Sequence, residues 1–310
     1  MAEQFPPNAF TSRRAIDPGL RPIARVLPRG YALHRGLKPQ RAIMKLLGSA
    51  GRDRRVPVEA INDHVSVRVH RPVSLPASAP ALLWIHGGGT VMGTAGQDDL
   101  YCRKLAHLCG IAVVAVEHRL APEHPYPAPL EDCYAALVWL ADQPWANRQR
   151  LAVGGASAGG YFAAALAQFA HDRDEVRPIF QMLIYPMLDD RTGPDSDNRK
   201  RIMWSARDNQ LAWQWYLGGA DVADAVPARR DDLSGLPAAW IGVGTLDLFY
   251  RECMEYGRRL REAGVPVHEE VAPGAFHAFD QLRANAPISV AFFASQCEHL
   301  RAALVDSSSE

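Results

Sequence analysis

The chain has 310 residues, of which 48% are hydrophobic, and its Lys and Arg residues balance its Asp and Glu residues to a formal net charge of zero. A chain of this length and apolar content can bury a large core. The neutral balance gives no electrostatic reason to expect nucleic acid or an anionic membrane as a partner, and we expect neither.

The N-terminal segment and the cysteines bear on location and metal binding. Met1 to Pro7 contains no apolar stretch of the kind that a secretion signal needs. The longest apolar run, around 162–166, is far too short to span a bilayer. Five scattered cysteines without a C-x-x-C pair indicate neither a disulfide framework nor a zinc site. We therefore expect a cytoplasmic protein without stable membrane insertion and without a metal site.

The first fifty residues differ from the rest by carrying six prolines. Apolar side chains such as Tyr31 and Leu33 could still be buried, and 41–47 has a short helical pattern, so this segment is predicted to be an arm that packs on the main body. The next segment, 64–70, alternates Val with polar residues, as expected of a half-buried hairpin at a sheet edge.

Short apolar runs then alternate with helical patterns. The runs that predict strands are 81–85, 111–116, 151–153, 180–184, 238–243 and 265–271. The patterns that predict helices are 98–109, 130–141, 158–171, 251–263 and 288–304. Apolar strands alternating with helices indicate a mostly parallel sheet covered on both faces. The interval of about fifty residues before Ala238 is too long for one crossover helix, and it predicts an inserted helical segment.

Two glycine-rich motifs follow predicted strands. His86-Gly87-Gly88-Gly89 follows 81–85, and Gly155-Ala156-Ser157-Ala158-Gly159-Gly160 follows 151–153. The second motif is typical of a serine nucleophile on a sharp strand-to-helix turn, and the first of a loop of backbone N–H donors. Acyl transfer needs both an attacking hydroxyl and donors for the oxyanion. A lone G-x-S-x-G could be an ordinary turn with a capping serine, but the two motifs in this order predict a serine hydrolase.

A serine nucleophile needs a base and an acid that orients the base. In this architecture the chain order is serine, acid, histidine. Asp247 follows the run 238–243 and His277 follows 265–271, so both should lie at the edge of the sheet that carries Ser157.

Each of these residues also has a structural interpretation. Asp247 could cap the helix that follows it, and His277 could be a packed loop histidine. Four other candidates are less well placed after the predicted strands, namely His118, His124, Asp189 and Asp190.

The chain from about 81 to 279 resembles the hormone-sensitive-lipase-like esterases, also called bacterial family IV, of the α/β-hydrolase fold. The residues that carry the resemblance are 86–89, His118-Arg119-Leu120-Ala121-Pro122-Glu123-His124-Pro125, 155–160, 232–237, Asp247 and Tyr256. The resemblance implies one domain over 1–310, with a mostly parallel eight-stranded sheet and helices on both faces. It also implies a helical cap formed by about 1–50 and about 187–225.

The resemblance assigns roles to single residues. It implies Ser157 as nucleophile, Asp247 as acid and His277 as base. It implies oxyanion donors at the backbone of Gly88, Gly89 and Ala158, with Gly87 shaping the loop. Members cleave carboxylic esters with short to medium acyl chains through an acyl-enzyme and need no cofactor. The expected partner is a small ester, and a homodimer is left open because relatives often form one.

Three departures from the family pattern concern the site. Ala156 precedes the nucleophile where relatives carry Asp or Thr, and we expect altered local hydrogen bonding. Thr90 follows the triple glycine in place of an aromatic residue and should change the shape of the pocket. In the motif around Asp247, Leu248 replaces a proline and Arg251 replaces the second acid.

The aromatic residues of the insertion, Trp204, Trp213, Trp215 and Tyr216, are candidates for the substrate pocket. They could instead anchor a cap helix, because Leu211 and Trp215 are spaced i, i+4. Two other functions stay open. One is an amidase or lactonase with the same triad, and the other is a non-catalytic binding protein on the same fold.

Overall fold

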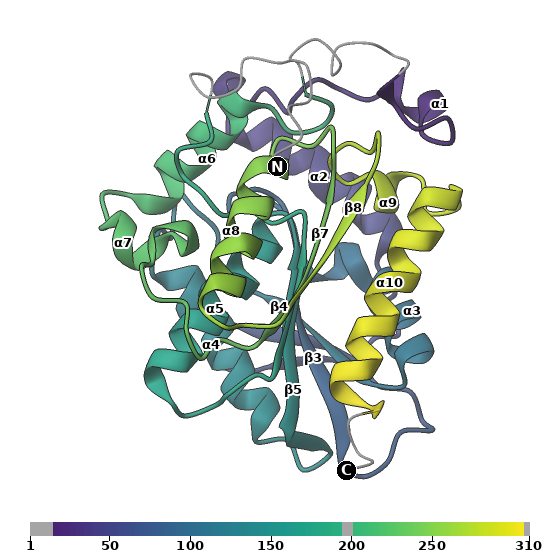
Figure 1. Ribbon diagram of the computed structural model, residues 1–310, viewed down its shortest axis with the longest axis vertical. Helices are drawn as coiled ribbons and strands as arrows, with labels where there is room; N and C mark the ends of the chain where they lie inside the picture. Colours follow the sequence, from purple (N-terminus) through teal and green to yellow (C-terminus); the bar gives the residue numbers. More distant parts are fainter. Residues whose placement is uncertain (1–14, 194–200, 307–310) are drawn as a thin grey trace.

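A computed structural model describes residues 15–193 and 201–306, and its central sheet has eight strands in the order β1-β2-β4-β3-β5-β6-β7-β8 (Figure 1). The strands are β1 Val58–Ala60, β2 Ser66–His70, β3 Ala79–Ile85, β4 Ala112–Glu117, β5 Ala146–Ala156, β6 Phe180–Ile184, β7 Ala238–Gly244 and β8 Val267–Ala272. The β1–β2 and β2–β4 pairs are antiparallel, and the other pairs are parallel. The prediction of a mostly parallel eight-stranded sheet is confirmed.

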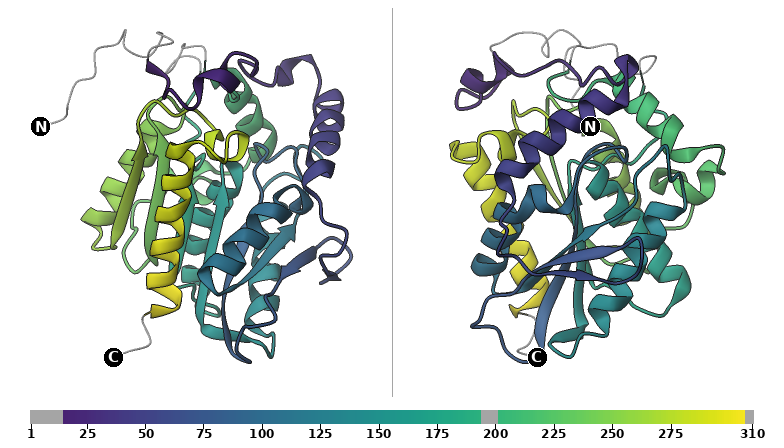
Figure 2. Two further views of the ribbon diagram at one scale, coloured as in Figure 1. Left: turned by 90° about the vertical axis from the view of Figure 1, so that its right-hand side faces the viewer. Right: turned by 180° about the vertical axis from the view of Figure 1, so that it is seen from behind.

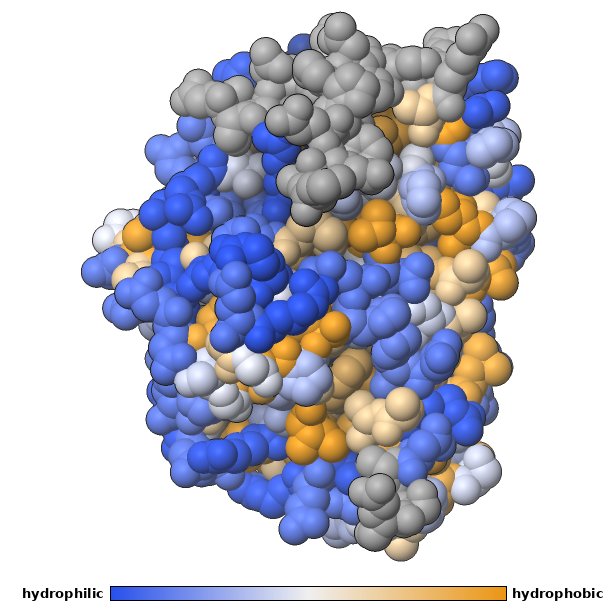
Figure 3. Space-filling view, in the orientation of Figure 1, coloured by the Kyte–Doolittle hydropathy of each residue, from blue (hydrophilic) through white to orange (hydrophobic). Residues whose placement is uncertain are grey.

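Helices cover both faces of the sheet, which is why the central strands are largely apolar. Every residue of β3 and of β6 is buried. Helices α3 (Asp99–Cys109) and α10 (Pro287–Leu304) contact each other on one face (Figure 2). Helices α4 (Ala128–Ala141) and α5 (Ala158–Arg173) contact each other, and α8 (Tyr250–Glu262) packs on β7 and β8. The solvent side of α8 is hydrophilic (Figure 3).

The edge hairpin differs from the simple alternation expected from its sequence. Val65 and Val67 are buried as expected, but Arg68 and His70 of β2 are also buried. The guanidinium of Arg68 forms an ion pair of 2.5 Å with Asp99 at the start of α3. The ion pair compensates the cost of removing the charge of Arg68 from water. Helix α3 therefore covers the face of β2 that carries Arg68 and His70, which the alternating pattern assigns to solvent.

Two elements are longer than their sequence signals. Strand β5 begins at Ala146, five residues before its apolar run. Its first five residues are at least partly exposed, so they carry no apolar signal. Helix α2 spans Leu37–Gly51, although the helical pattern predicts only 41–47. An exposed strand end and a solvent-facing helix need few apolar residues, so their boundaries leave weak signals.

The N-terminal arm and the insertion lie together at one end of the molecule, where Figure 1 shows α2 and α6 (Ala206–Leu217). The carboxylate of Asp208 in α6 accepts hydrogen bonds from the backbone N–H groups of Tyr31 and Leu33, both at 2.8 Å. Arg41 of α2 forms an ion pair with Glu123 at 2.7 Å. We call residues 15–51 of the arm and 201–225 of the insertion the covering layer.

The cap prediction extends beyond this layer, because 1–14 and 194–200 lie outside the described residues. The division of the chain into a body and a cap stays a prediction. No helix among the residues that the structure describes is long and apolar enough to cross a membrane.

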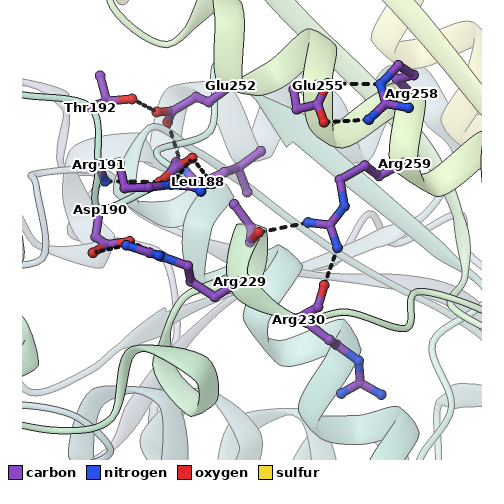
Figure 4. Close-up of polar contacts among 12 residues, drawn as sticks. Leu188, Asp190, Arg191, Thr192, Arg229, Arg230, Glu252, Glu255, Arg258 and Arg259 are labelled. Atoms are coloured by element: carbon purple, nitrogen blue, oxygen red, sulfur yellow. Dashed lines mark hydrogen bonds and ion pairs between the residues drawn. The ribbon is translucent and has the colours of Figure 1, made fainter. Parts of the chain in front are cut away.

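The base of the insertion is fastened to α8 (Figure 4). The buried carboxyl group of Glu252 accepts hydrogen bonds from the N–H of Leu188 at 2.6 Å and the hydroxyl of Thr192 at 2.5 Å. Arg259, two turns further along α8, donates to the carbonyl of Ala228 at 2.7 Å. Both ends of the insertion, after β6 and before β7, are therefore tied to one helix.

Candidate active site

Ser157 occupies the sharp turn between β5 and α5. Its backbone has φ 59° and ψ −119°, a region that costs free energy for a residue with a side chain. A β-carbon at Gly155 or Gly159 would collide with backbone carbonyls, including that of Ile85. The N–H of Ser157 donates to the carbonyl of Ile184 at 2.9 Å, which ties the turn to β6. The glycines of the motif are therefore required by close approach of the backbone around the serine.

Asp247, just after β7, and His277, just after β8, meet Ser157 at the same end of the sheet. The Nε2 atom of His277 lies 2.9 Å from Ser157 Oγ, and its Nδ1 atom lies 2.9 Å from Asp247 Oδ2. Ser157 is 9% exposed, His277 is 6% exposed and Asp247 is 1% exposed. The structure thus brings together all three residues of the sequence-predicted constellation in one hydrogen-bonded chain.

The local role considered for Asp247 coexists with this geometry. Its other oxygen, Oδ1, accepts a hydrogen bond from the N–H of Phe249 at 3.0 Å in the turn before α8. The carboxylate is thus held by the chain on one side and by the imidazole on the other. Aromatic rings of Tyr185 and Phe249 contact the imidazole of His277 edge-on, at centroid distances of 4.9 and 5.3 Å. These rings restrict the orientation of the imidazole of His277.

The triple-glycine loop after β3 lies next to Ser157. Gly88 and Gly89 have φ of 133° and 62°, conformations that favour glycine. A β-carbon at Gly88 would overlap the carbonyl of Met92. His86 Nδ1 lies 2.9 Å from the carbonyl oxygen of Gly87, which anchors the start of the loop.

The backbone N–H groups near Ser157 suit a developing negative charge. Gly87, Gly88 and Gly89 line the same cavity as Ser157. Ala158 is the first residue of α5, where the N–H has no partner within the helix and the helix dipole favours an anion. The residues that the sequence predicts as oxyanion donors are therefore gathered around Ser157.

The cavity above Ser157 has a volume of about 80 Å³. Among the predicted pocket residues, Trp204 lines it. The covering layer also contributes residues that the sequence reasoning missed, namely Tyr31, Met44 and Met203, and the body contributes Met92, Gln97, Tyr185, Ala278 and Gln281. These lining residues belong to no sequence motif, because they come from segments far apart in the chain. The only sequence signal was that Tyr31 is an apolar residue in a proline-rich arm.

Three predicted pocket residues lie elsewhere. The buried hydroxyl of Thr90 donates to the carbonyl of Gly89 at 2.5 Å, and Thr90 is not among the residues that line the cavity. Trp213 and Tyr216 of α6 pack against Tyr161 of α5, with the two tyrosine hydroxyls 2.8 Å apart. Trp215 is half-buried on the same helix. This arrangement agrees with the alternative that these aromatic residues anchor the helix to the body.

The competing residues are engaged in other contacts. His118 stacks on His86 with ring centroids 4.5 Å apart, and burial lowers the pKa of His118 to about 3, which keeps it neutral. Asp189 and Asp190 form ion pairs with Arg191 and Arg229. The backbone N–H of His124 donates to the carbonyl of Leu120 at 3.0 Å, and His124 is not among the residues that line the cavity.

The departures from the family pattern fall at different depths. Ala156 lines the cavity and is 3% exposed, Leu248 is buried, and Arg251 is exposed on α8. In the described ranges 15–193 and 201–306, no group of three or more His, Cys, Asp or Glu residues could hold a metal ion.

Comparison with known proteins finds relatives among esterases. A family model for the α/β hydrolase fold matches residues 82–281. The chain is 35% identical over 288 residues to the esterase LipI of Mycobacterium tuberculosis, covering 88% of this chain and 90% of the relative. It is 36% identical over 224 residues to the ethyl acetate hydrolase of Pseudomonas putida, covering 69% and 70%. A solved structure of a bacterial heroin esterase superposes with a TM-score of 0.86 at 34% identity, covering 95% of this chain and 99% of that one.

Proposed function

The chain belongs to the hormone-sensitive-lipase-like family of the α/β-hydrolase fold and is a carboxylesterase, and we propose that it cleaves small esters through an acyl-enzyme on Ser157. The observation that carries the proposal is the hydrogen-bonded chain from Ser157 through His277 to Asp247. Nucleophile, base and orienting acid in this arrangement are the recurring apparatus of acyl transfer.

In the proposed mechanism, His277 Nε2 takes the proton of Ser157 as Oγ attacks the ester carbonyl carbon. Asp247 holds the Nδ1–H tautomer and stabilises the imidazolium. The N–H groups of Gly88, Gly89 and Ala158 stabilise the oxyanion. His277 then protonates the leaving alcohol, and water attacks the acyl-enzyme with the same histidine as base. Release of the carboxylic acid regenerates Ser157.

The size of the cavity supports a short acyl group. A volume of about 80 Å³ next to Ser157 accommodates a few heavy atoms, and Trp204 and Tyr31 of the covering layer limit it, with ring centroids 5.8 Å apart. We expect kcat/KM for nitrophenyl esters to be highest for the acetate or propanoate and to fall from the hexanoate onward. A maximum at long, emulsified acyl chains would contradict this part of the proposal.

The matched amide and lactone separate the remaining hydrolase alternatives. The same triad could cleave them, and only the pocket and the protonation of the leaving group differ. We expect the ester to be turned over faster than its matched amide by orders of magnitude. A kcat/KM for the amide or the lactone equal to that for the ester would assign the enzyme to that class instead.

The central test replaces the nucleophile. Ser157→Ala should abolish hydrolysis of nitrophenyl acetate and covalent labelling by a fluorophosphonate, because both reactions need the hydroxyl. The matched control is Ser234→Ala, which removes a hydroxyl from an exposed residue before β7. Labelling that survives in Ser157→Ala sinks the serine assignment, and absence of labelling in the unmodified protein favours a non-catalytic binding protein.

A further inference from the structure

A second cavity, of about 300 Å³, lies between α3, α9 (Phe279–Leu282) and α10, on the side of the molecule that faces the viewer in Figure 2, left. It shares Gln97 and Gln281 with the cavity above Ser157, so the two spaces adjoin across these side chains. Its remaining lining residues are Asp98, Leu100, Tyr101, Lys104, Asp280, Ala284, Ser289 and Phe293. The mechanism proposed above uses none of these residues.

Two buried carboxyl groups line this cavity. Asp98 is 5% exposed and accepts a hydrogen bond from the indole N–H of Trp84 at 2.8 Å. Asp280 is 7% exposed and accepts one from the hydroxyl of Tyr185 at 2.9 Å. Among the described residues, neither carboxyl group forms an ion pair with a cationic side chain. Buried carboxylates are normally paired with a cation, so this pair is suited to a cation from outside the protein.

A third polar group points to the same kind of occupant. Ser289 at the start of α10 is 1% exposed and lines the cavity, and its hydroxyl has no hydrogen-bond partner within 15–193 and 201–306. An unpartnered buried hydroxyl costs free energy unless a ligand or water satisfies it. This hydroxyl is independent of the two carboxyl groups, because it comes from another helix.

The walls of the cavity are aromatic. The rings of Tyr101 and Phe293 meet edge-on with centroids 5.6 Å apart. The ammonium of Lys104, which lines the same cavity, lies over the Phe293 ring at 3.9 Å from its centroid, so this residue already occupies one aromatic face at the exposed rim. Aromatic walls with carboxylates behind them fit an alkylated ammonium group, which has apolar surface and positive charge.

The cavity is also linked to the reacting groups. Tyr185 donates to Asp280 through its hydroxyl, and its ring contacts the imidazole of His277 at 4.9 Å. One tyrosine ring therefore separates the base from the acidic cavity. Burial raises the pKa of both Asp98 and Asp280 to about 6, which leaves them mostly ionised at pH 7.5.

We propose that this cavity binds an ammonium group carried by the alcohol part of the ester substrate, held between Asp98, Asp280 and the Tyr101–Phe293 wall. The inference rests on the proposed ester hydrolysis at Ser157 and names the class of substrate that this site prefers. An ester bound with its carbonyl at Ser157 would extend its alcohol part past Gln97 and Gln281 into the second cavity.

The test compares two esters of equal shape that differ in one charge. They are 2-(trimethylammonio)ethyl acetate and 3,3-dimethylbutyl acetate, each also made with spacers of three and four carbons. We expect kcat/KM of the unmodified enzyme to favour the charged ester by about tenfold or more at one spacer length, in line with an ammonium held by carboxylates and aromatic rings. Equal values for both esters at every spacer length would overturn the proposal.

Variants locate the preference. Asp98→Asn and Asp280→Asn keep an oxygen acceptor for Trp84 and Tyr185, and each should lower the ratio of charged to neutral kcat/KM by severalfold, chiefly through KM for the charged ester. Glu298→Gln, an exposed change of equal charge on α10, should leave the ratio unchanged. A ratio that persists in both aspartate variants would place the recognition elsewhere and overturn the assignment.

A binding measurement separates this inference from the proposed chemistry. Purified Ser157→Ala protein is titrated with propyltrimethylammonium chloride, and its thermal midpoint is followed, with sodium chloride at equal ionic strength as reference. We expect stabilisation that Asp98→Asn removes, provided that circular dichroism shows that variant to be folded. Absence of any ammonium-specific shift would overturn the site even if hydrolysis at Ser157 is established. Retained hydrolysis in Ser157→Ala would overturn the chemistry alone.

Discussion

The indole of Trp204 lies directly against Gly89, so that a β-carbon at position 89 would overlap atoms of the ring. Gly89 belongs to the loop that carries the proposed oxyanion donors, and Trp204 belongs to the covering layer. The Trp204 ring is held by a hydrogen bond of 3.1 Å from its N–H to Asn209 of α6. The position of the donors is therefore coupled to the packing of a segment more than a hundred residues away in the chain.

This contact makes Gly89→Ala a sensitive substitution. The new methyl group meets both an unfavourable φ of 62° and the Trp204 ring, so the loop must shift and displace an N–H donor. We expect kcat for nitrophenyl acetate to fall by about 100-fold, the cost of losing one oxyanion donor. Gly110→Ala is the control, because Gly110 has φ 68° with nothing within 4 Å of its added β-carbon. Equal losses of kcat in both variants would show that backbone strain alone is responsible.

Replacement of Asp247, the proposed orienting acid, should lower kcat strongly without unfolding the protein. In Asp247→Asn the carboxylate that stabilises the Nδ1–H tautomer of His277 is replaced by an amide. We expect kcat to fall by about 10⁴-fold, as in a serine protease triad. Asp189→Asn changes an aspartate that pairs with Arg191 and should retain kcat. Stopped assays over the same ester concentrations measure both, and an Asp247→Asn variant with unchanged kcat would remove Asp247 from the mechanism.

The contact between the two parts of the covering layer can be broken at one residue. Asp208→Ala leaves the buried N–H of Leu33 and that of Tyr31 without their acceptor, at a cost of about 1–3 kcal/mol for an unsatisfied buried group. We expect faster amide hydrogen exchange around 28–36 and a raised KM. Asp224→Ala, at an exposed position in α7 (Val222–Ala225), should change neither. Unchanged exchange in Asp208→Ala would show that Asp208 does not hold the arm.

Stability should depend on pH through Asp98. Burial raises the pKa of this carboxyl from 3.8 to about 6, with His86 lowering it and Asp99 and Asp280 raising it by their charges. The folded state therefore holds the proton more tightly than the unfolded state, so this contribution to stability is complete below pH 3.8 and is lost as pH rises through 6.

The loss between pH 5 and pH 7.5 amounts to about 1.4 kcal/mol, since one pKa unit corresponds to about 1.36 kcal/mol. In Asp98→Asn this loss disappears, so the free energy of unfolding of the variant relative to the unmodified protein should improve by that amount from pH 5 to pH 7.5. Urea denaturation at the two pH values measures it. A relative stability that is the same at both pH values would contradict the raised pKa.

Local patterns in the chain were enough to predict much of the fold. The apolar run 180–184 coincides with β6, and the other strands and helices that were predicted for the body start or end within a few residues of their predicted bounds, apart from the exposed start of β5. Strand β1 lies before the predicted hairpin range 64–70, and α9 was not predicted. The spacing of apolar residues in each strand and helix follows from how that segment is buried, so it can be recognised in the segment alone. The meeting of Asp247 and His277 with Ser157 was also predictable, because strand ends of a parallel sheet converge at one edge.

Other features depended on contacts between remote segments. Thr90, Trp213 and Tyr216 were expected at the pocket, yet they pack elsewhere, while Tyr31 and Met44 line it. Arg68 reads as a solvent-facing residue of an edge strand, but Asp99 of α3 buries it. In each case the side chain type is compatible with several surroundings, and only the docking of another element decides between them.

By itself, the sequence determined the mostly parallel sheet, the serine turn, the glycine loop and the strand ends at which Ser157, Asp247 and His277 lie, because each depends on local periodicity or on backbone conformations that few residue types allow. Only the tertiary structure decided how large the cavity is, which residues close it, and that Asp98, Asp280 and Ser289 share a second cavity beside it. Those properties arise where segments far apart in the chain pack against one another and exclude water. No local sequence pattern predicts which segments pack together.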